Sequence, residues 1–340
     1  MGCNLEKSNR KNLLELSKRG KLVPYELSIE TVFGCNAKCP MCFIDEPTAR
    51  KKRVMKMDLY KSICDQMQPY AYNIEKFDFW CLGEPTIDPF LVERIYYAKK
   101  LGFKNTAVAT NGHSIDEEMA NGLIDSGIDT ILASIDATQA DTHQKVRVGL
   151  DFEKVVKNFE RLIYLRNKKK SKTRFIFRFV LQDINRHQYE EFEAYWAKLL
   201  DSDKRDDIYS YNEHNWGGYM GDKRIILGNK FSDFVEKKPC HYVFESLCIL
   251  ADGTLALCPA DFLEGKFNLG NVKETSPIEA FNSLAYKKIR KLNLEENKNA
   301  IDLCKSCTIL YSNANRSWSF KKHDNKGGLD RSEKQNYMKV

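Results

Sequence analysis

Short β-rich runs alternate with helical patterns over residues 26–215. Apolar residues recur at three-to-four spacing in the helical segments, near 55–68, 90–101, 115–126, 152–167 and 187–200. The predicted strands are rich in β-branched and aromatic residues and lie at 27–33, 76–82, 105–109, 129–135, 174–181 and 207–212. Six strands separated by helices predict parallel βα units with right-handed crossovers. Because six units are too few to close an eight-fold barrel, we expect an α/β fold with a partial (β/α)6 barrel.

The alternation ends after Trp216-Gly217-Gly218, and a smaller unit with its own hairpin at 246–258 follows. In either an open sheet or a partial barrel, the chemistry belongs at the carboxyl ends of the strands. The predicted divisions are an N-terminal extension, the barrel, a connector, a C-terminal domain and a polar tail, at 1–25, 26–218, 219–235, 236–318 and 319–340.

Composition narrows the class of protein. The formal net charge is +7, and all of it comes from residues 1–25 and 321–340, because residues 26–320 carry 42 basic and 42 acidic side chains. Basic ends are typical of solvated tails, so nucleic acid is not an expected partner. Charged residues interrupt every apolar stretch before the roughly 18 positions that cross a bilayer, and the first residues lack a secretory apolar region. We therefore expect a cytoplasmic protein without a membrane partner.

Eleven cysteines are too many for such a chain unless they bind metal or do redox work. Cys35, Cys39 and Cys42 form C-x3-C-x2-C, and Cys304 and Cys307 form C-x2-C. Three thiolates suit a [4Fe–4S] cluster with one iron left open. Zinc completed by a distant ligand is the alternative, although no His falls before position 113.

The first cysteine motif follows the first strand of a six-fold βα pattern, and in this it resembles the radical S-adenosylmethionine superfamily. The resemblance implies that S-adenosylmethionine chelates the open iron through its amino and carboxylate groups. One-electron reduction then yields a 5′-deoxyadenosyl radical that abstracts hydrogen from a substrate. The family usually has an aromatic residue before the third cysteine, where this chain has Met41, with Phe43 after the cysteine.

Further motifs agree with the resemblance in order and context. Gly83-Glu84-Pro85 resembles the family's "GGEP" element, which receives the methionyl ammonium, with Leu82 in place of the first glycine. A carboxylate at a strand end is a charge-assisted acceptor for such a group. The resemblance also implies cofactor contacts at the ends of the third, fourth and fifth strands, from Asn111, Ser134, Asp136 and Arg178. A guanidinium suits the bidentate binding of a carboxylate, which is the role expected of Arg178.

The C-terminal cysteines resemble the auxiliary-cluster domains called SPASM and, in shortened form, twitch. Twelve residues separate Cys240 from Gly253, and four residues separate Gly253 from Cys258, as that pattern requires. The later cysteines of the full pattern are missing after Cys307. The resemblance therefore implies one further [4Fe–4S] cluster, and zinc held by the same thiolates is the alternative. The four predicted ligands are Cys240, Cys258, Cys304 and Cys307.

Three other residues are candidates for catalysis. Cys81 is predicted on the second strand, where its thiol could donate a hydrogen atom, although a free cysteine is more often packing. Glu213 and His214 follow the sixth strand and could remove the proton beside a substrate radical. A hydrogen-bonded turn at the domain junction explains the same two residues equally well. Cys64 and Cys248 are expected to be buried packing residues.

The resulting hypothesis is an oxidoreductase that uses S-adenosylmethionine and two [4Fe–4S] clusters. The short cysteine pattern resembles that of dehydrogenases and epimerases acting on sugars, aminocyclitols and polyols, and dehydrogenation of such a small molecule is the favoured reaction. A one-electron reductant such as flavodoxin or ferredoxin is the expected partner. Epimerisation, radical modification of a ribosomal peptide, and a zinc-binding interaction protein without catalysis are the alternatives.

Overall fold

The computed structural model describes residues 21–220, 239–267, 269–305, 307–309 and 317–318. Most of the predicted N-terminal extension at 1–25, most of the connector at 219–235 and the whole tail at 319–340 lie outside the described residues. The predicted divisions of the chain at these segments therefore stay predictions.

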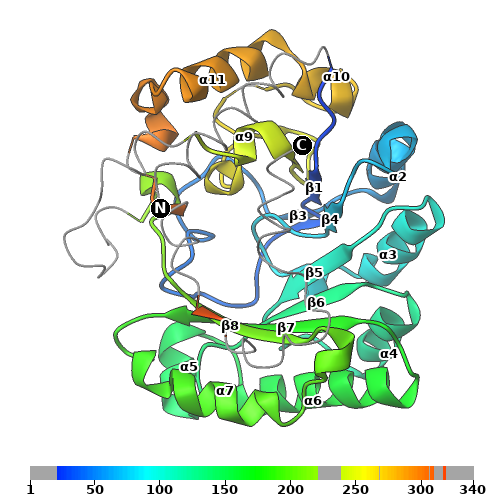
Figure 1. Ribbon diagram of the computed structural model, residues 1–340, viewed down its shortest axis with the longest axis vertical. Helices are drawn as coiled ribbons and strands as arrows, with labels where there is room; N and C mark the ends of the chain where they lie inside the picture. The colour runs from blue at the N-terminus through cyan, green and yellow to red at the C-terminus, as the bar shows by residue number, and fades with distance from the viewer. Residues whose placement is uncertain (1–20, 221–238, 268, 306, 310–316, 319–340) are drawn as a thin grey trace.

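Six parallel strands form the centre of one mixed sheet, in the sequential order of the prediction (Figure 1). The six are β1 (Glu26–Ile29), β4 (Lys76–Asp78), β5 (Thr106–Thr110), β6 (Thr130–Ser134), β7 (Arg174–Leu181) and β8 (Asp207–Asn212). The sheet curves without closing, and this confirms the partial barrel. A short strand, β11 (Ser317–Trp318), adds to β8 in the antiparallel direction.

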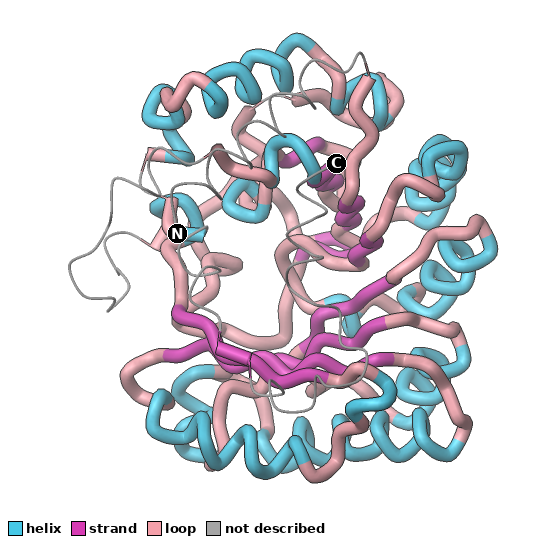
Figure 2. The backbone as a smooth tube through the Cα atoms, viewed as in Figure 1, coloured by secondary structure: helices cyan, strands magenta, loops and turns pink. Residues whose placement is uncertain are grey.

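Helices cover the outer, convex side of this sheet, and loops fill the space on its inner side (Figure 2). Aspartates begin two of the helices, because the side chain of Asp116 accepts a hydrogen bond from Met119 N and that of Asp151 accepts one from Lys154 N. The outer helices are α2 (Met57–Met67), α3 (Leu91–Lys100), α4 (Glu117–Asp125), α5 (Ala140–Val146), α6 (Phe152–Lys168) and α7 (Tyr189–Ala197).

Aromatic side chains join the helices to the sheet. The rings of Phe177 on β7 and Trp196 on α7 stack with centroids 4.2 Å apart, and Phe159 on α6 meets Phe177 edge-on. All three side chains are buried. Burying a side chain of this size contributes about 2 to 3 kcal/mol to folding, so these contacts fix the helices at their strands.

The C-terminal segment extends the same sheet. Strand β9 (Ser246–Ile249) pairs in parallel with β1, and β10 (Leu255–Ala256) pairs with β9 in the antiparallel direction. The predicted hairpin therefore covers the edge that β1 would expose in an open barrel. Three helices accompany it, α9 (Tyr242–Glu245), α10 (Pro277–Phe281) and α11 (Leu284–Leu294).

The observed elements differ from the predicted ones in three places. The first predicted strand divides after Ile29, and a separate strand, β2 (Val32–Phe33), pairs with β3 (Arg53–Val54). The second ends at Asp78 instead of residue 82, because the chain turns away once Phe79 N has bonded to Ala107 O. Helix α5 was not predicted, since its seven residues are too few for a clear apolar period.

Within the described residues, no helix combines the length and apolar character needed to cross a lipid bilayer. The longest, α6, has charged residues throughout its 17 positions.

Candidate functional site

A cavity of about 180 Å³ lies at the carboxyl ends of the parallel strands. Every central strand contributes to its wall, either directly or through the loop that follows it. The cysteines Cys35, Cys39 and Cys42 line it from the loop after β2. Other lining residues come from the ends of β4 to β8 or from the loops that follow them. They include Gly83, Glu84, Asn111, Ser134, Arg178, Tyr211 and Trp216.

The three cysteines lie on one short loop. Backbone bonds shape this loop, from Lys38 N to Val148 O and from Cys42 N to Cys39 O. Cys35 Sγ accepts a hydrogen bond of 3.4 Å from Ala37 N. Burial raises the pKa values of Cys35 and Cys42 to about 12, and neighbouring thiol groups contribute in the same direction. The thiols would therefore release protons when a metal binds.

The donor set fits a cluster better than a single ion. Among the described residues, no three His, Cys, Asp or Glu side chains gather closely enough to hold one metal ion. The thiols nevertheless interact electrostatically and face one cavity. Three thiolates spaced around a larger inorganic core, with one iron left for a ligand in the cavity, are consistent with this arrangement.

Glu84 is fixed by four hydrogen bonds. Its Oε1 accepts from the backbone and hydroxyl of Thr86 and from the hydroxyl of Thr110, and its Oε2 accepts from Asn111 N at 2.7 Å. The carboxylate is buried, which raises its pKa, while the bonds from Thr110 and Thr86 oppose this change. Among the described residues Oε2 has only one hydrogen-bond donor, so it is the oxygen that can receive a ligand's ammonium.

Gly83 lets this segment approach the cysteine loop. Its φ is +130°, and a Cβ there would lie 2.7 Å from the carbonyl oxygens of Gly34 and Val32. Glu84 N donates to Gly34 O across 2.8 Å. Pro85 begins the short 3-10 helix η2 (Pro85–Ile87) and is not part of the cavity wall.

The three strand-end candidates that line the cavity are all held by hydrogen bonds. Arg178 donates to Ser134 Oγ across 2.8 Å. Asn111 donates its amide to Asn36 Oδ1 and approaches Cys35 Sγ at 4.0 Å, so its side chain supports the cysteine loop. Arg178 Nε is buried and has no hydrogen-bond partner among the described residues, which suits a site for a ligand carboxylate.

Asp136 was predicted beside the cofactor, but its carboxylate lies behind the cavity wall. It is fully buried, accepts a hydrogen bond from Val180 N and forms an ion pair with Arg147. Arg147 does line the cavity and donates to Cys39 Sγ across 3.7 Å. Sequence reasoning missed Arg147, because it follows a short helix that was itself not predicted and belongs to no motif quoted above.

Aromatic residues complete the cavity wall, with Trp80 from the loop after β4, Tyr211 from β8 and Trp216 beyond it. The segment that contains Trp216 was expected to border the substrate, because it follows the sixth strand, whereas Trp80 and Tyr211 were not assigned to the site from sequence. Cys81 also lines the cavity, and its thiol lies 3.9 Å from Ser28 O. It lies in the loop after β4, not on the strand as predicted, because the strand ends earlier.

Glu213 and His214 follow β8 but are not among the residues that line the cavity. The His214 ring lies 4.1 Å from the ring of Trp216, which does line it. The prediction that either residue acts as a base is therefore not tested by this geometry.

The four C-terminal cysteines come together at a second place. Cys258 interacts electrostatically with Cys240, Cys304 and Cys307, although 49 residues separate it from the last of them in sequence. Burial raises the pKa values of Cys240 and Cys304 to about 12. Cys258 is buried and the other three cysteines are partly buried. A [4Fe–4S] cluster and zinc both accept four thiolates, and the spacing found among the described residues favours the larger core of a cluster.

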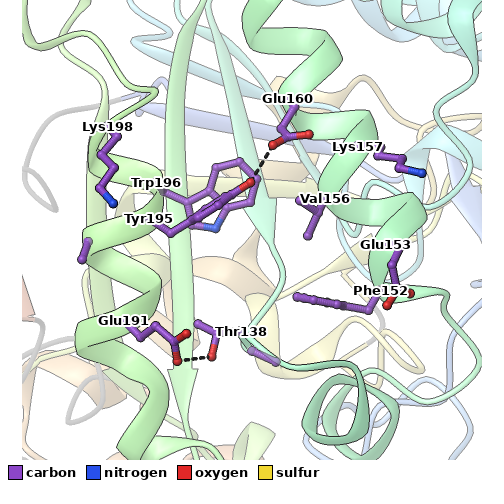
Figure 3. A pocket seen from close by; sticks show the side chains of 12 residues that line it. Thr138, Phe152, Glu153, Val156, Lys157, Glu160, Glu191, Tyr195, Trp196 and Lys198 are labelled. Atoms are coloured by element: carbon purple, nitrogen blue, oxygen red, sulfur yellow. Dashed lines mark hydrogen bonds between the residues drawn. The ribbon is translucent and has the colours of Figure 1, made fainter.

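A larger hollow of about 500 Å³ lies between α6 and α7 on the outer side of the barrel (Figure 3). Tyr195 donates to Glu160 and Thr138 donates to Glu191 along its walls. None of the predicted site residues lines it, and it shares no residue with the cysteine cavity. The chemistry therefore belongs to the smaller cavity.

Comparison with known proteins agrees with both cysteine sites. The model of the radical SAM superfamily matches residues 29–193, and that of an iron-sulfur cluster-binding domain matches residues 240–308. A tungsten-containing aldehyde ferredoxin oxidoreductase cofactor-modifying protein of Pyrococcus furiosus is 29% identical over 135 residues. That match covers 38% of this chain and 37% of the relative, so it spans well under half of each protein.

Two solved structures share the fold at low identity. BtrN in complex with AdoMet and 2-DOIA is 17% identical with a TM-score of 0.58, and the match covers 84% of this chain and 94% of BtrN. SuiB of Streptococcus suis, bound to the precursor peptide SuiA, is 18% identical with a TM-score of 0.61, covering 89% of this chain and 74% of SuiB.

The matched superfamily uses a [4Fe–4S] cluster and S-adenosylmethionine, and the matched C-terminal domain adds further iron–sulfur binding. The three thiols around the strand-end cavity and the four at the second site are the candidate ligands for these clusters. The chain belongs to the radical S-adenosylmethionine superfamily and carries a C-terminal iron–sulfur domain of the SPASM type.

Proposed function

We propose that this protein dehydrogenates a small polar molecule, such as a sugar, an aminocyclitol or another polyol. The observation that carries the proposal is one cavity in which three thiols, a fixed carboxylate and two guanidinium groups meet. Such a cavity holds a zwitterionic cofactor and leaves polar groups for a hydroxylated substrate.

The thiols of Cys35, Cys39 and Cys42 would hold a [4Fe–4S] cluster, which together with S-adenosylmethionine would supply the one-electron chemistry that removes a hydrogen atom from a substrate carbon. The chain's own residues position that cofactor. Glu84 Oε2 would receive the methionyl ammonium, because within the described part of the chain Asn111 N is its only donor. Arg178 and Ser134, joined by their hydrogen bond, take the carboxylate and the ribose hydroxyls. Gly83 brings Glu84 close enough to the cysteine loop for both contacts.

The second site favours oxidation. Cys240, Cys258, Cys304 and Cys307 offer four thiolates, so every iron of a cluster there has a protein ligand and none is open to a substrate. A closed cluster suits electron transfer. In the proposed reaction the substrate radical loses one proton to a base and one electron to this site, which leaves a carbonyl group.

Size and lining favour a small substrate. The structural match covers 94% of BtrN, which was solved with AdoMet and 2-DOIA, but only 74% of the peptide-bound SuiB. The cavity wall includes the phenol hydroxyl of Tyr211, a group that suits a substrate hydroxyl. Radical modification of a peptide is the less favoured reaction. An external one-electron reductant such as flavodoxin or ferredoxin would reduce the first cluster.

Epimerisation is the second candidate function, and Cys81 favours it. Its thiol lines the cavity and is buried, and burial raises its pKa well above the ordinary value, so the sulfur keeps its hydrogen. A neutral thiol can return a hydrogen atom to a substrate radical, whereas a thiolate cannot.

The experiment is turnover of a panel of sugars, aminocyclitols, polyols and short peptides by the anaerobically reconstituted protein in D₂O. Dehydrogenation predicts one equivalent of oxidised product per 5′-deoxyadenosine, and the Cys81→Ala variant should make the same product. Epimerisation predicts deuterium at the inverted carbon, with loss of that product in the Cys81→Ala variant. Conversion of the peptides alone would contradict the proposed substrate class. Zinc without acid-labile sulfide after reconstitution would contradict an enzymatic role.

A further inference from the structure

A turn after β8 lies between the two cysteine sites. Residues Asn215 to Gly218 include the short 3-10 helix η5 (Trp216–Gly218), and three successive residues adopt positive φ angles. Trp216 has a φ of +48°, Gly217 of +68° and Gly218 of +98°. A bulky residue such as Trp rarely adopts this conformation, and it persists only where the surroundings enforce it.

Asn215 locks one side of the turn to the second cysteine site. Its Oδ1 accepts hydrogen bonds from the backbone and the hydroxyl of Thr308, and its own N–H donates to Thr308 Oγ1 across 2.9 Å. Thr308 directly follows Cys307. The backbone N–H of Gly217 also interacts with the Cys307 thiol and lowers its pKa, against the raising effect of burial.

The turn also packs on the segments that carry two other cysteines. It contacts η6 (Pro259–Asp261), which follows Cys258, and η8 (Asp302–Cys304). A Cβ at Gly217 would lie 2.8 Å from Leu303 Cδ1 and 3.0 Å from Ala260 Cβ. Glycine is therefore required here, both for the positive φ and for this close approach.

The Trp216 side chain reaches the first cysteine site. Its indole N–H donates to the carbonyl oxygen of Met41 across 2.8 Å, and its ring stacks on Phe43 with centroids 4.6 Å apart. Met41 and Phe43 flank Cys42. The same indole lines the cavity. One turn thus contacts the first cysteine loop, the cavity and the second cysteine site.

We propose that Trp216 is a positioning residue that holds the Gly217 N–H against Cys307 and thereby raises the reduction potential of the auxiliary cluster. The inference rests on the proposed electron-accepting role of that cluster and assigns this chain's own residues to it. A hydrogen bond to a ligating sulfur stabilises the more negative, reduced form of an iron–sulfur cluster. The turn therefore makes the auxiliary cluster a better electron acceptor.

The experiment measures the midpoint potentials of both clusters by EPR-monitored redox titration of the full-length, anaerobically reconstituted protein without substrate. Trp216→Phe keeps an aromatic ring but loses the bond to Met41. Thr308→Val keeps the shape of its side chain but loses the hydroxyl that bonds to Asn215. Trp80→Phe is the matched control, since Trp80 lines the same cavity from the loop after β4 and belongs to no part of the turn.

We expect the auxiliary potential to fall in Trp216→Phe and in Thr308→Val and to stay unchanged in Trp80→Phe, with full iron content in all three. Two test variants guard against a folding defect in either one. About eight irons per chain with an unmoved auxiliary potential in both test variants would overturn this inference alone and leave the proposed function standing. About four irons per wild-type chain would overturn both this inference and the proposed function.

Discussion

Arg147 donates a hydrogen bond to the sulfur of Cys39 across 3.7 Å, and this places a permanent positive charge beside a predicted cluster ligand. Asp136 holds the guanidinium there through an ion pair. The Asp136 carboxylate is fully buried and the Arg147 side chain is 14% exposed, so the pair is well shielded from solvent. Asp136, which was predicted to touch the cofactor, thus holds Arg147, which lines the cavity.

Replacing Arg147 by Gln should lower the midpoint potential of the first cluster. The positive charge favours the reduced form of the cluster, and its loss removes that effect. The variant should also lose about 3 kcal/mol of stability, because Asp136 is left buried without its partner. Redox titration followed by EPR measures the potential, and thermal unfolding measures the stability.

The double variant with Asp136→Asn and Arg147→Gln is the matched control for that experiment. It removes both charges, so stability should recover while the potential stays low. An unchanged potential in the single variant would show that Arg147 does not act on the cluster.

Replacing Cys35, Cys39 and Cys42 together by Ala should reduce the iron content from about eight to about four atoms per chain. Reductive cleavage of S-adenosylmethionine should disappear, because the open iron is lost. Iron analysis and chromatographic detection of 5′-deoxyadenosine measure the two effects. Cys64→Ala is the control, since Cys64 is buried on α2 and lies outside the cavity. Cleavage that survives in the triple variant would refute the assignment of these ligands.

The variant with Cys304→Ala and Cys307→Ala should keep the first cluster and still form 5′-deoxyadenosine without oxidised product. All four predicted ligands of the second site come from residues 240–307, so the first cysteine loop keeps its own thiols. Cys248→Ala provides the control, since Cys248 is buried on β9 and is not a predicted ligand. Full product formation by the double variant would remove the electron-transfer role.

Glu84→Gln should weaken binding of S-adenosylmethionine by about tenfold or more, which corresponds to about 1.4 kcal/mol. With the amide oxygen on the side of Thr86 and Thr110, the amide NH₂ would face both Asn111 N–H and the ligand's ammonium. Equilibrium dialysis of the reconstituted protein measures the affinity. Glu93→Gln, an exposed change on α3, should leave it unaltered. Equal affinities in the two variants would exclude Glu84 from the ammonium site.

The ion pair between Arg50 and Glu30 predicts a pH effect on stability. Glu30 is fully buried, and burial raises its pKa to about 7 although Arg50 opposes that change. A carboxyl group with a raised pKa stabilises the fold in its protonated form, so its contribution is present below the unfolded pKa and is lost as pH rises to about 7. Arg50→Met should cost about 3 kcal/mol at pH 8.

At pH 5.5 Glu30 is protonated in the folded variant, because loss of Arg50 raises its pKa further. The difference in unfolding temperature between Arg50→Met and the wild type should therefore be smaller at pH 5.5 than at pH 8. An equal difference at the two pH values would show that Glu30 is ionised throughout this range and would contradict the prediction. Differential scanning calorimetry at both pH values makes the comparison.

The sequence by itself determined the order of the central strands and the two groups of cysteines. Strand runs such as 174–181 and the apolar period of 152–167 are local signals, so they can be recognised in the sequence without knowledge of the fold. The spacing of Cys35, Cys39 and Cys42 is also local, as is Gly83-Glu84 after its strand. These features were enough to predict the partial barrel and where its chemistry lies.

The tertiary structure alone decided how distant segments meet. The pairing of β9 with β1 joins residues more than 200 positions apart, and no periodicity encodes a partner at that distance. Arg147 lines the cavity and Asp136 does not, and the ion pair that joins them was not visible in the sequence pattern. Trp216 joined both cysteine sites because a strained turn is held by contacts from three separate segments. Periodicity depends on neighbouring residues, whereas such contacts depend on packing of the whole chain.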